Sequence, residues 1–244
     1  MKIHYELDPS TRKEKIVDQV RFLHGLVDKI NVPDNPMGYI KASSLAVSIF
    51  LKQIGFEPVM HIRAIDRTML AIKSEVYGAK LFNINEILLV KGDIPSKENF
   101  EVFNNNRLER IVEYLKEDEK IKDIKIGLPL TNFSKISDFS LSRLNSKADF
   151  IVTTQIRNAR EINEELIKVI RRNNKELHCY YILVTDKNKD FIYNFGLVKE
   201  DKVPSLEEYL NYIEELETVV DALILSSPLD LEFLTILLNK YRRK

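Results

Sequence analysis

The chain has 244 residues, 44% of them hydrophobic, which is enough for one large core or two small ones. Lys and Arg total 37, as do Asp and Glu, so the zero formal net charge leaves no positive field to hold nucleic acid or an acidic membrane. The single cysteine, Cys179, excludes an intrachain disulfide and a cysteine-based metal cluster, and no signal-peptide core or apolar run of about 18 residues occurs. We expect one domain over residues 1–244, located in the cytoplasm, and the charge does not indicate its preferred ligand.

Short runs rich in β-branched residues alternate with longer amphipathic segments along the whole chain. The predicted strands span residues 2–7, 29–32, 58–63, 86–92, 123–128, 149–154, 177–184 and 222–227. A repeated strand-then-helix order favours a parallel sheet, because each crossover must carry the chain back before the next strand starts. Eight such units predict an α/β fold of the closed (β/α)8 TIM-barrel type, with an open doubly wound sheet as the second choice.

The segments between these strands have helical spacing of apolar residues. The stripes expected to cover the sheet are Ile16, Val20, Leu23 and Val27; Leu45, Ile49 and Ile54; Leu70, Ser74, Tyr77 and Leu81; Leu108, Ile111, Val112 and Leu115; and Ile162, Leu166, Val169 and Ile170. Ser205 and Glu208 have the spacing of a capping box at the start of a helix, and a last helix is expected over about 229–241. Residues 94–106 are the longest stretch without periodicity and predict a long loop on the catalytic face.

Polar residues recur at the carboxyl ends of the predicted strands, where barrel enzymes build their sites. Alternation places His4 and Glu6 on one side of the first strand, and places His61 and Arg63 on the side of Val59. Three more polar residues end later strands: Lys91 and Asp93, on the side of Leu89, and Gln155, which follows Ile151 and Thr153. Each alone is best explained as the solvated end of a strand. Together, two carboxylic acids, an imidazole, an amide and a lysine suit a polar heterocycle better than a divalent metal.

Several common catalytic signatures are absent from the sequence. It contains no GxGxxG, P-loop, GxSxG or HExxH motif. His4, His61 and His178 lie on separate predicted strands without ligand spacing, so no metal site is expected. Tyr180 and Tyr181 are expected to pack a layer of the barrel.

Four segments, in order and spacing, carry a family resemblance. They read HYELDPS (4–10), NVPDNPMG (31–38), HIRAIDRTMLAIKSEVYGAKLFNINEILLVKGDIP (61–95) and ADFIVTTQ (148–155). This pattern resembles the methylenetetrahydrofolate reductase family, in its short members that consist of the catalytic domain alone. The resemblance extends more loosely through FGLVKEDKVP (195–204) and implies a (β/α)8 barrel that carries FAD.

The resemblance implies a role for three residues near the substrate. Glu6 matches the acid that helps to open the bridged methylene group to an iminium, a role that requires a protonated carboxyl near pH 7. Asp93 matches an aspartate beside flavin and pterin, where a carboxylate can accept two hydrogen bonds from the pterin ring. Gln155 matches a glutamine whose amide holds the same ring.

Cofactor contacts are implied in the same way. His61 matches a histidine on the flavin side, Asp66 and Arg67 match an Asp-Arg pair that follows it, and Lys91 is expected at the polar edge or phosphates of the flavin. Gly92 is expected to let a bound ring approach the backbone, and Asp93, also expected to contact the cofactor, to point at that ring.

The implied reaction passes a hydride from NAD(P)H through FAD to a methylene-tetrahydrofolate or related methylene-pterin, which yields the 5-methyl product of one-carbon metabolism. The sequence departs from the family at GLPLT (127–131), which lacks a Y-P-E, and at Ile156 and Arg157, where aromatic residues are expected. A reductase without flavin, one that needs an electron-delivering partner subunit, and a catalytically silent structural or regulatory subunit remain alternatives. The sequence does not indicate whether the chain forms a homo-oligomer.

Overall fold

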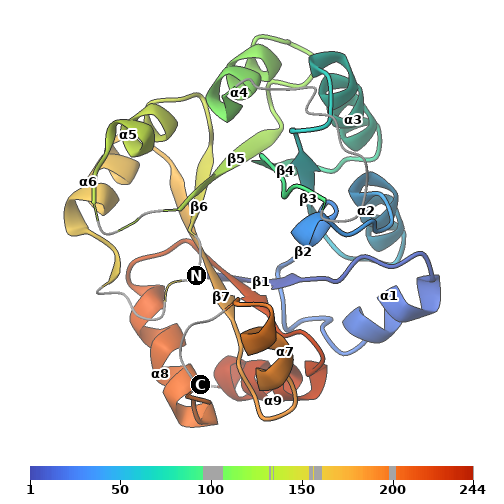
Figure 1. The fold of residues 1–244 in the computed structure, drawn as a ribbon, viewed down its shortest axis with the longest axis vertical. Coiled ribbons are helices and arrows are strands. Elements are labelled where there is room, and N and C mark those ends of the chain that lie inside the picture. The colour runs from blue at the N-terminus through green and yellow to red at the C-terminus, as the bar shows by residue number, and fades with distance from the viewer. Residues whose placement is uncertain are drawn as a thin grey trace.

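The computed structural model describes residues 1–95, 107–131, 133, 135–153, 156, 161–197 and 202–243. Eight parallel strands close into a barrel in chain order, so the fold is a (β/α)8 TIM barrel, as the alternating pattern predicts (Figure 1). The strands are β1 (Lys2–Glu6), β2 (Lys29–Val32), β3 (Pro58–Arg63), β4 (Glu86–Val90), β5 (Lys125–Leu130), β6 (Phe150–Thr153), β7 (Glu176–Ile182) and β8 (Ala222–Ser226).

The helices form a ring outside the barrel (Figure 1). They are α1 (Lys13–Val20), α2 (Ser44–Gln53), α3 (Met69–Leu81), α4 (Leu108–Lys116), α5 (Asp138–Leu144), α6 (Glu164–Arg172), α7 (Lys189–Asn194), α8 (Leu206–Glu217) and α9 (Leu231–Arg242), and a 3-10 turn, η1 (Pro36–Gly38), follows β2. The short helix α7, which the sequence reading did not separate, precedes α8 between β7 and β8. Among the described residues, no helix is long and apolar enough to cross a bilayer.

Alternation along the strands places most of the core in two layers, and a small third cluster contains Ile182, Val184 and Ile192. The larger layer packs between strands and helices and includes Ile3, Tyr5 and Leu7, which are fully buried. A small inner layer lies within the barrel and is formed by Val59, Leu88, Phe150, Val152 and Ile224. Gly127 on β5 makes room for this layer, because a Cβ there would lie 2.0 Å from the Phe150 ring. His4 and Glu6 therefore point into the barrel, as the period-2 pattern predicts.

Most of the predicted apolar stripes are buried against the sheet, including Leu108, Ile111, Val112 and Leu115 on α4. The stripe predicted for α3 is wrong. Leu70 and Leu81 are 78% and 75% exposed, and Ile72, Val76 and Ala79 face the core instead. Apolar side chains occur around most of this helix, so two stripes satisfied the helical spacing and only packing against the barrel selected one.

Local signals at element ends match the structure well. Ser205 and Glu208 form the predicted capping box at α8, with the Ser205 hydroxyl accepting from Glu208 N–H at 3.2 Å. Strand β4 ends at Val90, two residues before the predicted end, because Gly92 has φ +92° and cannot continue an extended strand. Of the expected loop at 94–106, residues 96–106 lie outside the described part of the chain.

Candidate active site at the carboxyl end of the barrel

A carboxylic acid and a phenol meet inside the barrel near the carboxyl ends of β1 and β7. The Tyr180 hydroxyl donates to Glu6 Oε1 at 2.7 Å, and both side chains are half-buried. Removal from water raises the pKa of Glu6, and this effect outweighs the hydrogen bonds from Tyr180 and Ser226, which lower it. The same burial raises the pKa of Tyr180 well above its ordinary value, so the phenol stays a hydrogen-bond donor. Glu6 is therefore suited to donate a proton near neutral pH.

Two neutral histidines inside the barrel are joined by an amide. The buried Asn31 accepts from His61 Nε2 at 3.1 Å through its oxygen, and its nitrogen lies 3.3 Å from His4 Nδ1. An amide oxygen only accepts and an amide NH₂ only donates, so His61 carries its proton on Nε2 and His4 accepts at Nδ1. Burial lowers the pKa of His61 to about 3, and burial together with the nearby His178 lowers the pKa of His4.

Aromatic rings pack beside these histidines inside the barrel. The His178 ring stacks on Phe150 at a centroid distance of 4.5 Å and meets His4 edge-on at 5.5 Å. His178 Nε2 lies 3.0 Å from Glu176 Oε2, at the amino end of β7. Although the sequence separates His4, His61 and His178, the barrel gathers them, and amide and aromatic contacts hold them. No group of three or more His, Cys, Asp or Glu residues that could hold a metal occurs in the described part of the chain.

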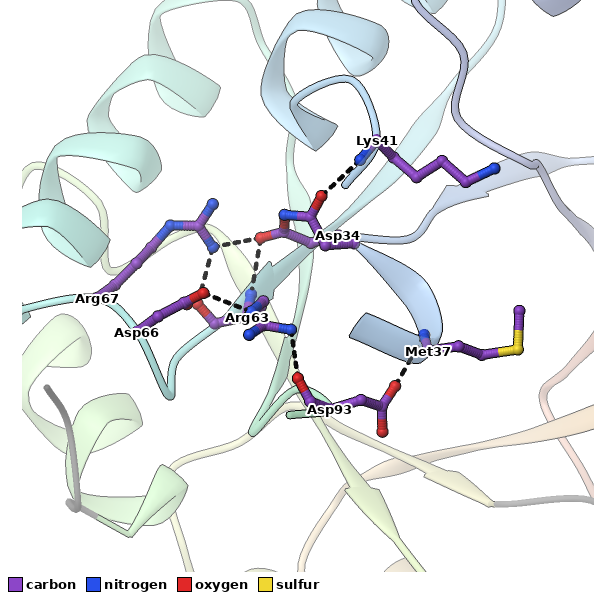
Figure 2. Close-up of polar contacts among 8 residues, drawn as sticks. Asp34, Met37, Lys41, Arg63, Asp66, Arg67 and Asp93 are labelled. Atoms are coloured by element: carbon purple, nitrogen blue, oxygen red, sulfur yellow. Dashed lines mark hydrogen bonds and ion pairs between the residues drawn. The ribbon is translucent and has the colours of Figure 1, made fainter. Parts of the chain in front are cut away.

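A network of charged side chains links the loops that follow β2, β3 and β4 (Figure 2). Asp34, which is 6% exposed, accepts from the Arg63 backbone N–H at 3.0 Å and pairs with the Arg67 guanidinium. The buried Arg63 side chain donates from Nε to Asp66 at 2.7 Å and from Nη1 to the Asp93 carbonyl at 2.6 Å. Asp66 thus pairs with Arg63, three residues earlier in the same segment, and Arg67 pairs with Asp34 across neighbouring loops.

The Asp93 carboxylate forms a hydrogen bond with the turn after β2. Its Oδ2 accepts from the Met37 backbone N–H at 2.9 Å (Figure 2). That turn is strained, because Asn35 and Met37 have φ values of 50° and 56° without being glycine. Gly38 packs against the chain after Asp93, where a Cβ would lie 2.9 Å from the Ile94 carbonyl oxygen. The η1 turn and the β4 loop therefore form one unit at the inner rim of the barrel mouth.

The β4 turn differs in part from the expectation for Gly92. Its backbone needs a positive φ, but the space beside its Cα holds the Arg63 side chain, whose Cγ would lie 2.7 Å from an added Cβ. The glycine thus accommodates a protein side chain on that side. Lys91 and Asp93, on either side of Gly92, are exposed. They do not follow Leu89 into the outer layer, because the strand ends at Val90 and its alternation ends with it.

The predicted site residues fall into three groups. Glu6 and His61 lie inside the barrel, while Lys91, Gly92, Asp93, Asp66 and Arg67 lie in the adjoining loops after β3 and β4. Gln155 lies outside the described residues. The sequence pattern predicted that Tyr180 packs in a layer of the barrel and did not indicate its contact with Glu6. The signal was available, because alternation places Tyr180 on the same side of β7 as His178. Asn31 and Asp34 were not predicted as site residues either, although both occur in the NVPDNPMG segment.

A closed (β/α)8 barrel with a carboxyl of raised pKa and charged side chains near its mouth has the arrangement in which barrel enzymes place their sites. The sequence profile described as methylenetetrahydrofolate reductase matches residues 11–161, and the chain belongs to that family. This confirms the resemblance read from the sequence and supports a folate-related, reductase-like function. No curated protein matches this chain in sequence.

Two solved structures share the fold. One is described as an "Uncharacterized protein from Clostridium thermocellum" that "binds two copies of 5-methyl-5,6,7,8-tetrahydrofolic acid"; it is 14% identical, with a TM-score of 0.68, over 99% of this chain and 95% of that one. The other is the GH18 chitinase ChiB from Flavobacterium johnsoniae, 9% identical with a TM-score of 0.57, over 98% of this chain and 94% of that one. At these identities the likeness concerns the barrel itself, which hosts unrelated chemistries.

Proposed function

We propose that the protein reduces a methylene-tetrahydrofolate, or a related methylene-pterin, to its 5-methyl form. The observation that carries the proposal is Glu6, a half-buried carboxyl with a raised pKa at the carboxyl end of β1, in a chain of this family. The methyl-folate bound by the Clostridium thermocellum structure corresponds to the product of such a reaction and supports the substrate class.

Glu6 serves as the general acid in this proposal. Its protonated form transfers a proton to the bridging nitrogen of the substrate, which opens the methylene bridge and leaves an iminium that accepts a hydride. An ordinary glutamate is almost fully ionised at pH 7, whereas burial in the barrel favours the neutral acid. The Glu6 carboxylate that remains is stabilised by the Tyr180 hydroxyl until it is protonated again.

Asp93 and Gln155 are proposed to orient the pterin. Asp93 is exposed at the rim, and Met37 N–H occupies only its Oδ2. Among the described residues, Oδ1 has no hydrogen-bond partner, so it is available to a ring N–H or exocyclic amine. Because Oδ2 is held by the η1 turn, the direction of Oδ1 is fixed before substrate binds, which lowers the entropy cost of alignment.

FAD is the proposed cofactor, and the donor set fits its polar ring. His61 is a neutral imidazole, Asp93 is a rim carboxylate, the turn at Gly92 brings backbone to the mouth, and Lys91 is an exposed cation suited to a phosphate. When bound, FAD supplies the hydride that it has taken from NADH or NADPH. These residues would hold the cofactor, and the barrel would keep water away from the iminium.

The decisive experiment is reoxidation of the photoreduced, FAD-loaded protein by methylene-tetrahydrofolate without oxygen, with Glu6→Gln as the matched variant. We expect substrate-dependent reoxidation in the wild type and a rate lower by about 10²–10⁴-fold in Glu6→Gln, the range for a lost general acid. If the flavin stays reduced with every methylene-pterin offered, the reductase proposal fails. If both proteins reoxidise at one rate, the acid assignment fails.

One observation favours a second candidate, a reductase of the same substrate that uses no flavin. Asp66 and Arg67, which the family resemblance assigns to cofactor binding, are both engaged in ion pairs with Arg63 and Asp34. Purified protein that is yellow and releases FAD on denaturation supports the first candidate. Colourless protein that oxidises NADH only when methylene-folate is present supports the second.

A further inference from the structure

Tyr180 reaches across one strand of the barrel to contact Glu6. The two residues are 174 positions apart in sequence, and β8 lies between their strands in the sheet. The Tyr180 ring packs against the inner layer of the core, beside residues such as Ile224, so the position of the hydroxyl is set by packing. The O–O distance of 2.7 Å is that of a well-formed hydrogen bond.

The other groups that face Glu6 come from every neighbouring element. The Ser226 hydroxyl on β8 lies within hydrogen-bonding reach of both Glu6 and Tyr180, Asp8 after β1 adds a like charge, and Asn31 on β2 pairs with Glu6 in the strand register. Among the described residues, none of the groups that shift the pKa of Glu6 is a cation. The carboxyl is therefore held by neutral donors, of which Tyr180 has the larger effect.

We propose that Tyr180 is a positioning residue for Glu6, whose hydroxyl holds Oε1 and leaves Oε2 to carry the transferable proton. This inference rests on the proposed function. In a protonated carboxyl group one oxygen bears the proton and the other only accepts, so a donor fixed on Oε1 favours the proton on Oε2. During transfer the Oε2–H bond breaks, an N–H bond forms on the substrate, and the electron pair remains on the carboxylate that Tyr180 stabilises.

A hydroxyl that donates to a carboxylate stabilises the ionised form, so its removal favours the acid. In Tyr180→Phe we therefore expect the pKa of Glu6 to rise further, which moves the alkaline limb of the activity profile to higher pH. We also expect the maximal rate to fall by about tenfold, because the proton is no longer confined to one oxygen. Tyr181→Phe is the matched control, since Tyr181 lies next in the strand but faces outward toward Tyr209.

The titration of Glu6 is measured by carbon NMR on protein labelled at glutamate carboxyl carbons, with the Glu6 signal identified by its loss in Glu6→Gln. This readout needs neither substrate nor cofactor. We expect the Glu6 titration to shift upward in Tyr180→Phe and to stay unchanged in Tyr181→Phe. Difluorotyrosine placed at position 180 is a stronger donor of similar size and should shift the titration downward, which provides a second test if Tyr180→Phe does not fold.

The outcomes separate the two proposals. An unchanged Glu6 titration in Tyr180→Phe, or in the difluorotyrosine protein if Tyr180→Phe does not fold, overturns the positioning role. Equal losses of activity in Tyr180→Phe and Tyr181→Phe, with one pH profile for both, also overturn it, because they indicate only a damaged strand. If the titration shifts as expected while the wild type reduces no methylene-pterin, the contact acts as described and the proposed reductase function is wrong.

Discussion

Replacing Asp34 by alanine removes the carboxylate that joins the loops after β2 and β3. Its side chain is 2% exposed, and it accepts from the buried Arg63 N–H, from the Arg67 guanidinium and from Asn35 Nδ2. Breaking a buried ion pair by removing one partner costs about 3–5 kcal/mol, and the Arg67 side chain, at 21% exposure, can regain some hydration. We therefore expect a loss near the lower limit, about 3 kcal/mol, a large share of the ~5–15 kcal/mol by which domains are stable.

The loss is measured by urea unfolding followed by circular dichroism, with Asp34→Asn as a variant of the same shape. The asparagine retains one acceptor oxygen and removes the charge, so it should lose less than the alanine. At a cost of about 3 kcal/mol, the melting temperature of a chain of this size should fall by roughly 6–12 °C. A drop below about 1 kcal/mol in Asp34→Ala would refute the reasoning, because it would mean that water replaces all three contacts without cost.

Three further changes follow from the same geometry. Because the folded-state pKa of Glu6 is raised, its neutral form contributes stability that is lost as pH rises through that pKa, so Glu6→Gln should be more stable than wild type at alkaline pH and equal to it in acid, by thermal unfolding. Burial depresses the pKa of His61 to about 3, so the wild type loses up to about 5 kcal/mol of stability as pH falls from 6.5 to 3, because the unfolded chain gains a proton that the buried ring does not. His61→Gln should lose less stability over the same range, measured by urea unfolding at each pH. Equal losses in the two proteins would contradict this. Gly92→Ala forces a Cβ to 2.7 Å from Arg63 at φ +92° and should cost about 1–3 kcal/mol, measured by urea unfolding; a neutral result would show that the turn relaxes freely.

Much of the site could be predicted because strand ends in a parallel barrel all face one way. Alternation placed Glu6 on the side of β1 opposite Ile3 and Tyr5, and its position at the end of the strand placed it near the mouth. Alternation failed for Asp93, whose location depends on a turn in which Gly92 has a positive φ. The ion pair of Arg67 was not predictable either, since its partner Asp34 comes from the loop after β2 and the choice of partner depends on distance in space, whereas Asp66 pairs with Arg63 only three residues away.

The sequence by itself determined the number of units, their order and which residues of a strand share a side, because these depend on local periodicity along one strand or helix at a time. Tertiary structure alone decided which face of α3 is buried, and that the Tyr180 hydroxyl donates to Glu6 while its ring packs on the inner layer. The physical reason is closure of the sheet. Residues 174 positions apart become neighbours only when β7, β8 and β1 pair, and no local pattern records which side chains then lie within 3 Å of each other.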